Sequence, residues 1–297
     1  MSATVPRVED DGADHSAGTD RPAIDVPIGA CDCHMHVFDD AFPLAPSAVL
    51  THASAGLVAY RRLQERLGLH RHVLVQPSVY GVDNRLLLQT LAAAGSCALG
   101  VAVIDDRVTD AQLQDLAAKR VVGTRFNLVQ RGATQIGMLR DVASRIRPFG
   151  WHVQLHLHPD ELLAHENLIA NLPVPVVLDH WGRVASEPSK EAAVSACIQR
   201  LLDGGNTWVK LSGAYLASHA RPRFADLGVH AKAWAAARRD RLVWGTDWPH
   251  ATEAEKPDDA ALIDLLPQWL PDAVIRHEVL VTNPARLYGF EDCTPGR

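Results

Sequence analysis

Hydrophobic and polar positions alternate along the chain in one repeating order. Short apolar runs rich in β-branched residues are each followed by a longer segment with helical spacing. Short runs of this kind are typical of buried strands. They predict eight strands, at Ala30–His36, His72–Pro77, Ala98–Ile104, Val122–Phe126, Trp151–Leu157, Pro175–His180, Trp208–Ser212 and Leu242–Asp247.

The segments between these runs carry helix signals. In Leu57–Leu69 apolar residues recur three and four positions apart, and Gly68 marks the end. Thr109 and Gln112 form a capping box, and Pro159 is placed to open the helix after the fifth strand. The other predicted helices are Asn84–Ala94, Met138–Phe149, Glu191–Asp203, Ala225–Arg239 and Asp259–Leu270.

Eight alternations of strand and helix predict a (β/α)8 TIM barrel. A doubly wound sheet is the competing fold, but it usually carries a glycine-rich phosphate loop after its first strand, and this chain has none there. We find no internal repeat and no linker, so we predict a single catalytic domain over residues 23–297. Residues 1–22 are acidic and rich in small side chains, which predicts a disordered tail.

Charge and cysteine content narrow the possible partners and location. The net charge of −6 gives no basic surface for nucleic acid or an anionic membrane. No apolar run approaches the roughly 20 residues of a membrane span, and the N-terminus lacks the apolar stretch of a signal peptide. Five cysteines, an odd number, do not indicate a disulfide framework. We therefore expect a cytoplasmic protein that acts on a small molecule; its oligomeric state stays open.

The first predicted strand contains the sequence Cys-Asp-Cys-His-Met-His at positions 31–36. Side chains alternate between the two faces of a strand. Asp32, His34 and His36 should therefore face the barrel interior, whereas Cys31, Cys33 and Met35 should pack against helices. The two imidazoles would then lie at the carboxyl end of the strand, where barrel active sites are found.

Other strand ends carry matching side chains. The fifth strand ends at His156, the sixth at Asp179 and His180, and the eighth at Asp247. Imidazole nitrogens and carboxylate oxygens that meet at one barrel mouth suit a divalent ion such as zinc. A bulge in the fifth strand would instead present His158, so that alternative remains. Asp179 is interpreted as a supporting group and not a ligand.

Several motifs together resemble the amidohydrolase superfamily. They are DCHMHVF, VLVQPSVYG, GTRFNL, WHVQLHL, PVVLDHWGR, VKLSG, WGTDWPH and TNPARLYGF, which extend from about residue 28 to residue 290. The resemblance is narrower to the branch of lactone hydrolases that includes 2-pyrone-4,6-dicarboxylate lactonase and 4-sulfomuconolactone hydrolase. Its implied fold is again the TIM barrel.

The resemblance also implies roles for individual residues. The implied metal ligands are His34, His36, His156 and Asp247, and the implied catalytic residues are Asp247 and His180. The implied substrate contacts are Arg125, Arg131 and Ser78, and Tyr80 is added as a wall or hydrogen-bond donor of the pocket.

Two departures from the pyrone lactonase pattern refine the expected substrate. His156 stands where that enzyme carries tyrosine and works without metal, which favours a bound divalent ion. Zinc is the expected ion, because nitrogen and oxygen ligands suit it. Leu216 stands where it has a further substrate arginine, which disfavours the pyrone dicarboxylate. The expected activity is metal-dependent hydrolysis of an anionic lactone, foremost 4-sulfomuconolactone to maleylacetate and sulfite, or a close dicarboxylate relative. Hydrolysis of a sugar-acid lactone, non-oxidative decarboxylation and ligand binding without catalysis are the alternatives.

Overall fold

The protein is described by a computed structural model over residues 14–130, 132–290 and 293. Eight parallel strands follow one another round a single sheet in sequence order, so the predicted TIM barrel is confirmed. All eight predicted strands are present, within a few residues of their expected ends. They are β1 (Cys31–Met35), β2 (Arg71–Val75), β3 (Ala98–Ala102), β4 (Val121–Asn127), β5 (His152–His156), β6 (Val176–Leu178), β7 (Thr207–Leu211) and β8 (Leu242–Trp244).

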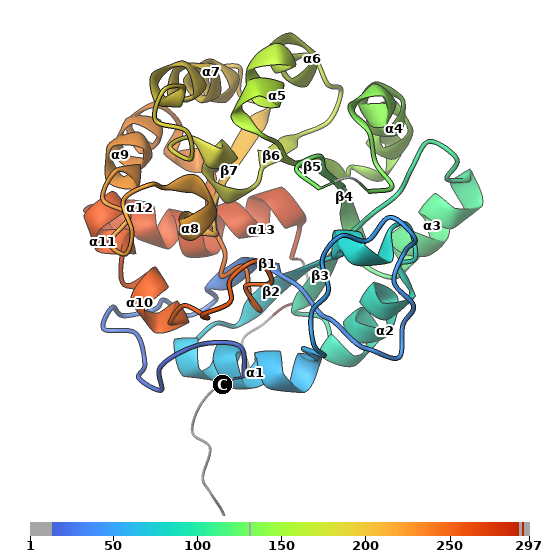
Figure 1. Ribbon diagram of the computed structural model, residues 1–297, viewed down its shortest axis with the longest axis horizontal. Coiled ribbons are helices and arrows are strands. Elements are labelled where there is room, and N and C mark those ends of the chain that lie inside the picture. Colours follow the sequence, from blue (N-terminus) through green and yellow to red (C-terminus); the bar gives the residue numbers. More distant parts are fainter. Residues whose placement is uncertain (1–13, 131, 291–292, 294–297) are drawn as a thin grey trace, which may run out of the picture.

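Most helices surround the strands as an outer ring, whereas α13 crosses one end of the barrel and α8 lies inside the ring (Figure 1). The helices are α1 (Leu57–Leu67), α2 (Arg85–Ala94), α3 (Asp110–Ala118), α4 (Leu139–Ile146), α5 (Pro159–Ala164), α6 (Glu166–Ala170), α7 (Glu191–Asp203), α8 (Ala214–Ala217), α9 (Leu227–Arg238), α10 (Asp259–Ile263), α11 (Leu266–Trp269), α12 (Ala273–His277) and α13 (Asn283–Tyr288). The capping box at Thr109 and the first-turn Pro159 are confirmed. The predicted helix Asp259–Leu270 is instead divided into α10 and α11, and Pro267, which lacks an N–H, lies in the first turn of α11.

The barrel closes between β1 and the segment that follows β8. The amide of Asp247 donates to the carbonyl of His34 over 2.8 Å, and the amide of His36 donates to the carbonyl of Trp248 over 2.8 Å. Asp32 adds a side-chain link, because its carboxylate accepts from the Thr246 amide at 3.0 Å and from the Thr246 hydroxyl at 2.6 Å. These bonds place the ends of the first and last strands side by side.

The predicted side-chain alternation of the first strand is wrong in part. Cys31 and Cys33 belong to the apolar cluster inside the barrel, with residues of five other strands and Tyr288, whereas Met35 packs in the cluster shared with the helices. Asp32 points out toward α1, where the Tyr60 hydroxyl donates to it over 3.0 Å. The pairing of β1 with β2 shifts between Asp32 and Met35. Such an irregularity changes the face on which later side chains lie.

Residues near both ends of the described chain are bonded to the barrel. The sequence predicts a disordered tail over residues 1–22. In its described part, Asp14 accepts through its carbonyl from the indole of Trp248, and the hydroxyl of Ser16 accepts from Arg66. Residues 1–13 lie outside the described residues. A disulfide joins Cys97 to Cys293, so the expectation of no disulfide, drawn from the odd number of cysteines, is wrong for this pair.

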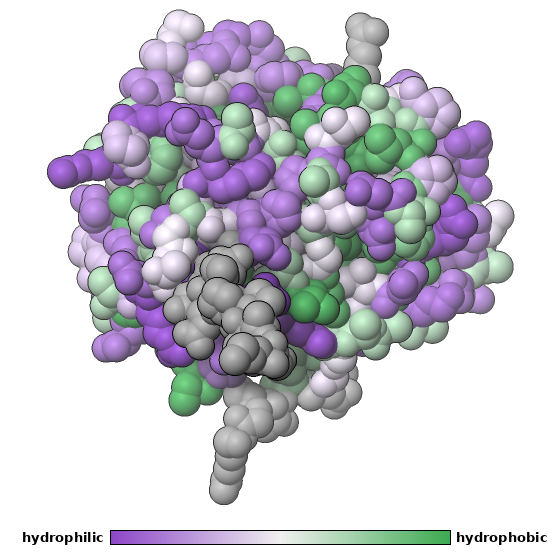
Figure 2. Space-filling model, turned by 60° about the horizontal axis from the view of Figure 1, so that its bottom comes forward, coloured by the Kyte–Doolittle hydropathy of each residue, from purple (hydrophilic) through white to green (hydrophobic). Residues whose placement is uncertain are grey.

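The outer surface is mixed in character. On the face shown in Figure 2, polar side chains are interspersed with smaller apolar areas. Within the described residues, no helix combines the length and the apolar character needed to cross a membrane.

Candidate active site

Three imidazoles and one carboxylate meet at the carboxyl ends of the strands. The Nε2 atoms of His34 and His36 are 3.2 Å apart. Oδ1 of Asp247 lies 3.6 Å from Nε2 of His34, 3.7 Å from Nε2 of His36 and 3.9 Å from Nε2 of His180. The predicted convergence joins the ends of strands one, five, six and eight. The structure brings together the side chains from strands one, six and eight, but the donor atoms of His156 from strand five are not in either converging group.

Burial sets the charge of these groups. It lowers the pKa of His36 to about 3 and holds the pKa values of His34 and His180 well below their usual range. These imidazoles are therefore neutral and have a lone pair available. Burial also raises the pKa of Asp247 to about 7, against the lowering effect of a hydrogen bond from Tyr215.

A second layer of buried polar side chains lies beneath His34. Asp179 accepts from Nε of Arg125 at 2.9 Å and from the Gln154 amide at 3.1 Å, and its other oxygen lies 3.5 Å from Nζ of Lys210. Lys210 donates to the Gln154 carbonyl at 2.7 Å and contacts Nδ1 of His34 at 3.2 Å. Burial raises the pKa of Asp179, but His34, Lys210 and Arg125 outweigh it and hold that pKa well below its usual range.

Sequence reasoning did not select Lys210 or Tyr215. Lys210 is a single charged residue in an otherwise apolar strand, and its side chain has no exposed surface. A lysine at such a position is expected to be buried, and a buried lysine needs an oppositely charged or hydrogen-bonding partner. Lys210 could therefore have been predicted from the sequence. Tyr215 donates to Oδ2 of Asp247 over 2.7 Å, but nothing in the local sequence around it indicates this contact.

Backbone conformation brings His180 and Asp247 close together. Both are in the left-handed region, with φ of 48° and 68°, which costs non-glycine residues energy and is concentrated at functional sites. Gly213, which follows β7, leaves room for this approach. A Cβ on Gly213 would lie 2.8 Å from Nδ1 of His180 and 3.1 Å from Oδ2 of Asp247, so a side chain is excluded there.

Most of the predicted residues line one cavity at this mouth. Its walls include His36, Ser78, Arg125, His156, His180 and Asp247, together with the apolar side chains of Phe38, Leu50, Val79 and Leu216. Ser78 accepts from the Asn127 amide at 2.7 Å. Tyr80 is buried, but it is absent from the lining. Its hydroxyl accepts from the amide of Asp39 at 2.9 Å and donates to the carbonyl of Asp39 at 3.3 Å. Arg131 lies outside the described residues.

His156 has a different setting from the other imidazoles. It faces the cavity, its ring centre lies 4.7 Å from that of His180, and neither of its ring nitrogens has a hydrogen-bond partner in the described part of the chain. His156 is not among the groups whose donor atoms converge within 4.8 Å. The alternative, His158, is exposed and caps the start of α5.

The donor atoms fit a divalent ion. His34, His36 and Asp247 form one group of converging donor atoms, and His34, Asp179 and His180 form a second. An ion with bonds of about 2.0–2.1 Å separates tetrahedral ligands by about 3.3 Å, close to the 3.2–3.7 Å among the first three. Nδ1 of His36 contacts the carbonyl of Val75 at 2.7 Å, which places the proton there and leaves Nε2 free as a ligand.

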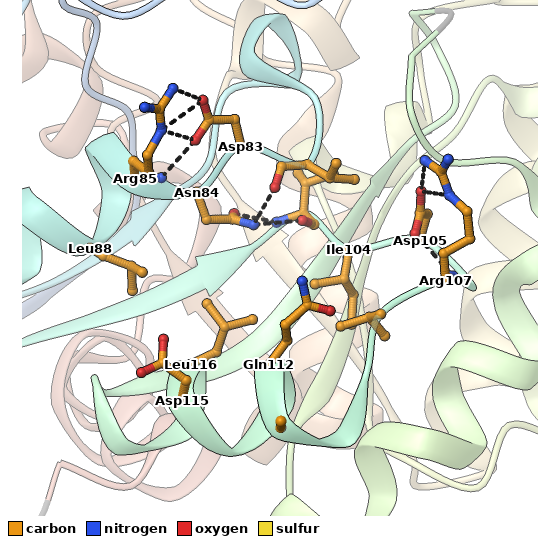
Figure 3. A pocket seen from close by; sticks show the side chains of 14 residues that line it. Asp83, Asn84, Arg85, Leu88, Ile104, Asp105, Arg107, Gln112, Asp115 and Leu116 are labelled. Atoms are coloured by element: carbon orange, nitrogen blue, oxygen red, sulfur yellow. Dashed lines mark hydrogen bonds and ion pairs between the residues drawn. The ribbon is translucent and has the colours of Figure 1, made fainter.

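A larger cavity of about 690 Å³ lies elsewhere, between α2 and α3 (Figure 3). Its two arginines are each paired with a neighbouring aspartate, Arg85 with Asp83 at 2.6 Å and Arg107 with Asp105 at 2.5 Å. It contains none of the predicted site residues, so size does not identify the active site here.

Comparison with known proteins gives the chain its family. Residues 31–290 match the amidohydrolase family. The chain is 34% identical over 272 residues to a 4-sulfomuconolactone hydrolase of Rhizobium radiobacter, covering 89% of this chain and 91% of that protein. It is 34% identical over 295 residues to a 2-pyrone-4,6-dicarbaxylate hydrolase of Comamonas testosteroni, covering 94% and 96%. It is 33% identical over 267 residues to a D-galactarolactone isomerase of Agrobacterium fabrum strain C58, covering 88% and 91%. The chain is therefore an enzyme that belongs to the amidohydrolase family.

Proposed function

We propose that this enzyme hydrolyses the ring ester of a small anionic lactone with the help of one divalent ion, zinc being the leading candidate. 4-Sulfomuconolactone or a close dicarboxylate relative is the leading substrate. The observation that carries the proposal is the convergence of three neutral imidazoles on Oδ1 of Asp247 beside the cationic side chain of Arg125. The named relatives support the lactone class.

His34, His36 and Asp247 would hold the ion. When bound, such an ion polarises a carbonyl and lowers the pKa of a coordinated water to about 7. The carboxylate of Asp247 would accept a proton from the attacking water, and its Oδ2 also accepts a hydrogen bond from the Tyr215 hydroxyl at 2.7 Å. His180 then donates a hydrogen bond to the oxygen that becomes negative in the ring carbonyl.

Arg125 binds the acid group of the substrate. Its Nε is used by Asp179, so the remaining guanidinium N–H groups are available to the cavity that Arg125 lines. Arg125 and Lys210 share the single carboxylate of Asp179, and this layer therefore carries excess positive charge. A carboxylate or sulfonate compensates that excess through charge-assisted hydrogen bonds.

The cavity walls leave two kinds of ring open. Phe38, Leu50, Val79 and Leu216 present apolar surface that suits a flat unsaturated ring. Ser78, Asn127, Gln130 and Thr252 also line the cavity and offer hydrogen-bond partners to the hydroxyl groups of a sugar-acid lactone. Isomerisation of a sugar-acid lactone, suggested by the third relative, is the second candidate function.

The test combines metal analysis with a substrate panel. The purified protein is analysed for metal and then supplied with sulfonated, dicarboxylate and sugar-acid lactones while base consumption and CO2 are measured. Hydrolysis of a charged unsaturated lactone, with base consumed, no CO2 released and activity lost on chelation, supports the proposal. Release of CO2 would identify a decarboxylase, and conversion of a sugar lactone without net acid would identify an isomerase; either result overturns it.

A further inference from the structure

One wall of the active-site cavity contains a buried asparagine with two directed contacts. Asn127 is the last residue of β4, and only 8% of its surface is exposed. It lies two positions after Arg125, so both side chains project from the same face of the strand, and both line the cavity. Ser78, which follows β2 and is partly buried, lines the same cavity and is bonded to Asn127.

The two contacts of the Asn127 amide fix its orientation. The backbone amide of Gln130 lies 3.3 Å from Oδ1 of Asn127, and a backbone amide can only donate, so the atom facing it must be the oxygen. The side-chain nitrogen therefore faces Ser78 and donates to its Oγ over 2.7 Å. A hydroxyl that accepts this bond must direct its own proton elsewhere. Within the described residues Oγ of Ser78 makes no second hydrogen bond, so it has a donor to offer to a ligand in the cavity.

We infer that Asn127 is a positioning residue that holds Ser78 as a hydrogen-bond donor to the acid group of the substrate. Arg125 also offers only donors, since a guanidinium has no acceptor. Carboxylate and sulfonate oxygens only accept, so they satisfy both residues. A carboxamide of the same shape turns an N–H group toward one of these donors, which is then left without a partner. The inference deepens the proposed function and rests on it in one respect, namely that the cavity binds an anion.

The direction of the Ser78 bond decides which ligand is favoured. A buried donor that finds no acceptor in the complex costs binding free energy. A carboxylate or sulfonate oxygen accepts from Ser78 and avoids that cost. If the neighbour of Ser78 presented only acceptors, Ser78 would donate to it, and the lone pairs of its oxygen would face the acid group and repel it.

Asn127→Asp reverses the bond with little change of shape. A carboxylate keeps the bond from the Gln130 amide but has no donor, so Ser78 must donate to it and can then only accept from a ligand. The probes are isophthalate, a planar ring with two carboxylates, and its monoamide, and their dissociation constants are measured by calorimetry on the full-length enzyme as purified. The wild type should prefer isophthalate, and Ser78→Ala and Asn127→Asp should each lower this preference by about tenfold or more.

A double variant separates the orientation of Ser78 from the added charge. Asn127→Asp introduces a negative charge that repels an acid group whether or not the serine hydroxyl is present. In the Ser78→Ala background there is no hydroxyl to reverse, so the same change should lower the preference by about tenfold less than it does in the wild type. Asn167→Asp adds the same charge at an exposed position in α6, and this matched control should leave the preference unchanged.

The outcomes distinguish this inference from the proposed function. Equal effects of Asn127→Asp in the two backgrounds, or a wild type that does not prefer isophthalate, overturn the positioning role of Asn127. So does an unchanged preference in Ser78→Ala, a variant that removes a single oxygen atom and does not depend on the folding of Asn127→Asp. The expected difference between the backgrounds supports the inference even where no lactone is hydrolysed, and the absence of turnover would then overturn only the proposed function.

Discussion

Replacing Asp247 by asparagine tests the centre of the proposed chemistry. Asp247 has φ of 68°, a left-handed conformation that asparagine adopts almost as readily as aspartate. Its Oδ2 accepts from Tyr215, and the carbonyl oxygen of an asparagine can keep that bond. The amide nitrogen then takes the place of Oδ1, 3.6–3.9 Å from the Nε2 atoms of the three histidines. The shape of the site is preserved, but its basic oxygen is lost.

The expected fall in turnover follows from the loss of the general base. Removal of a general base typically lowers turnover by about 10²–10⁴-fold. An amide nitrogen is not a metal ligand at neutral pH, so the bound metal per chain should fall as well. The melting temperature should change by only a few degrees, since the Tyr215 bond and the backbone conformation are retained.

The assay measures kcat, metal content and melting temperature for Asp247→Asn and for Asp106→Asn, an exposed aspartate outside the mouth. The control should match the wild type in all three. An Asp247→Asn enzyme that keeps kcat within about tenfold, with normal folding, would refute the assignment of Asp247 as base.

Three further predictions follow from buried contacts. Arg125→Met should raise KM about 10–150-fold for a doubly charged lactone and little for a neutral one, because a charge-assisted bond is lost; equal losses on both, measured by steady-state kinetics, would make Arg125 structural. Gly123→Ala should destabilise the fold by about 1–3 kcal/mol in urea unfolding, because a Cβ there would come within 2.4 Å of the His152 ring. Protein unfolded without reductant should titrate three thiols and reduced protein five; five in both would exclude the Cys97–Cys293 bond.

Periodicity predicted the barrel well because the strands are buried on both faces and the long helices on one. It failed at β1, where the alternation rule assumes an uninterrupted ladder. Cys31 and Cys33 face the barrel interior, and the shift between Asp32 and Met35 allows His34 and His36 to face the mouth on the same side. The prediction that His34 and His36 face the mouth is therefore correct. It was based on regular strand pairing, which β1 does not have.

The unpredicted parts of the site are those made by long-range contacts. Tyr215 and Asp247 are 32 positions apart, and Lys210 and His34 are 176 apart. Sequence motifs identify site residues at strand ends, because the topology of the barrel places all of these ends at the same mouth. They do not mark residues that reach the site from a neighbouring element, as Tyr215 does from α8. A cysteine count likewise does not reveal a bond between residues separated by 196 positions.

The arrangement of charge explains how an acidic protein can bind an anion. The chain has a net charge of −6, so its surface repels the proposed substrate at long range. Under the mouth, Arg125 and Lys210 surround one carboxylate, and the histidines above them are neutral because they are buried. Attraction therefore acts only at short range, inside a site that water screens poorly. Under the proposed function, an acid group on the substrate balances this layer and places the attached ring ester close to the carboxylate of Asp247.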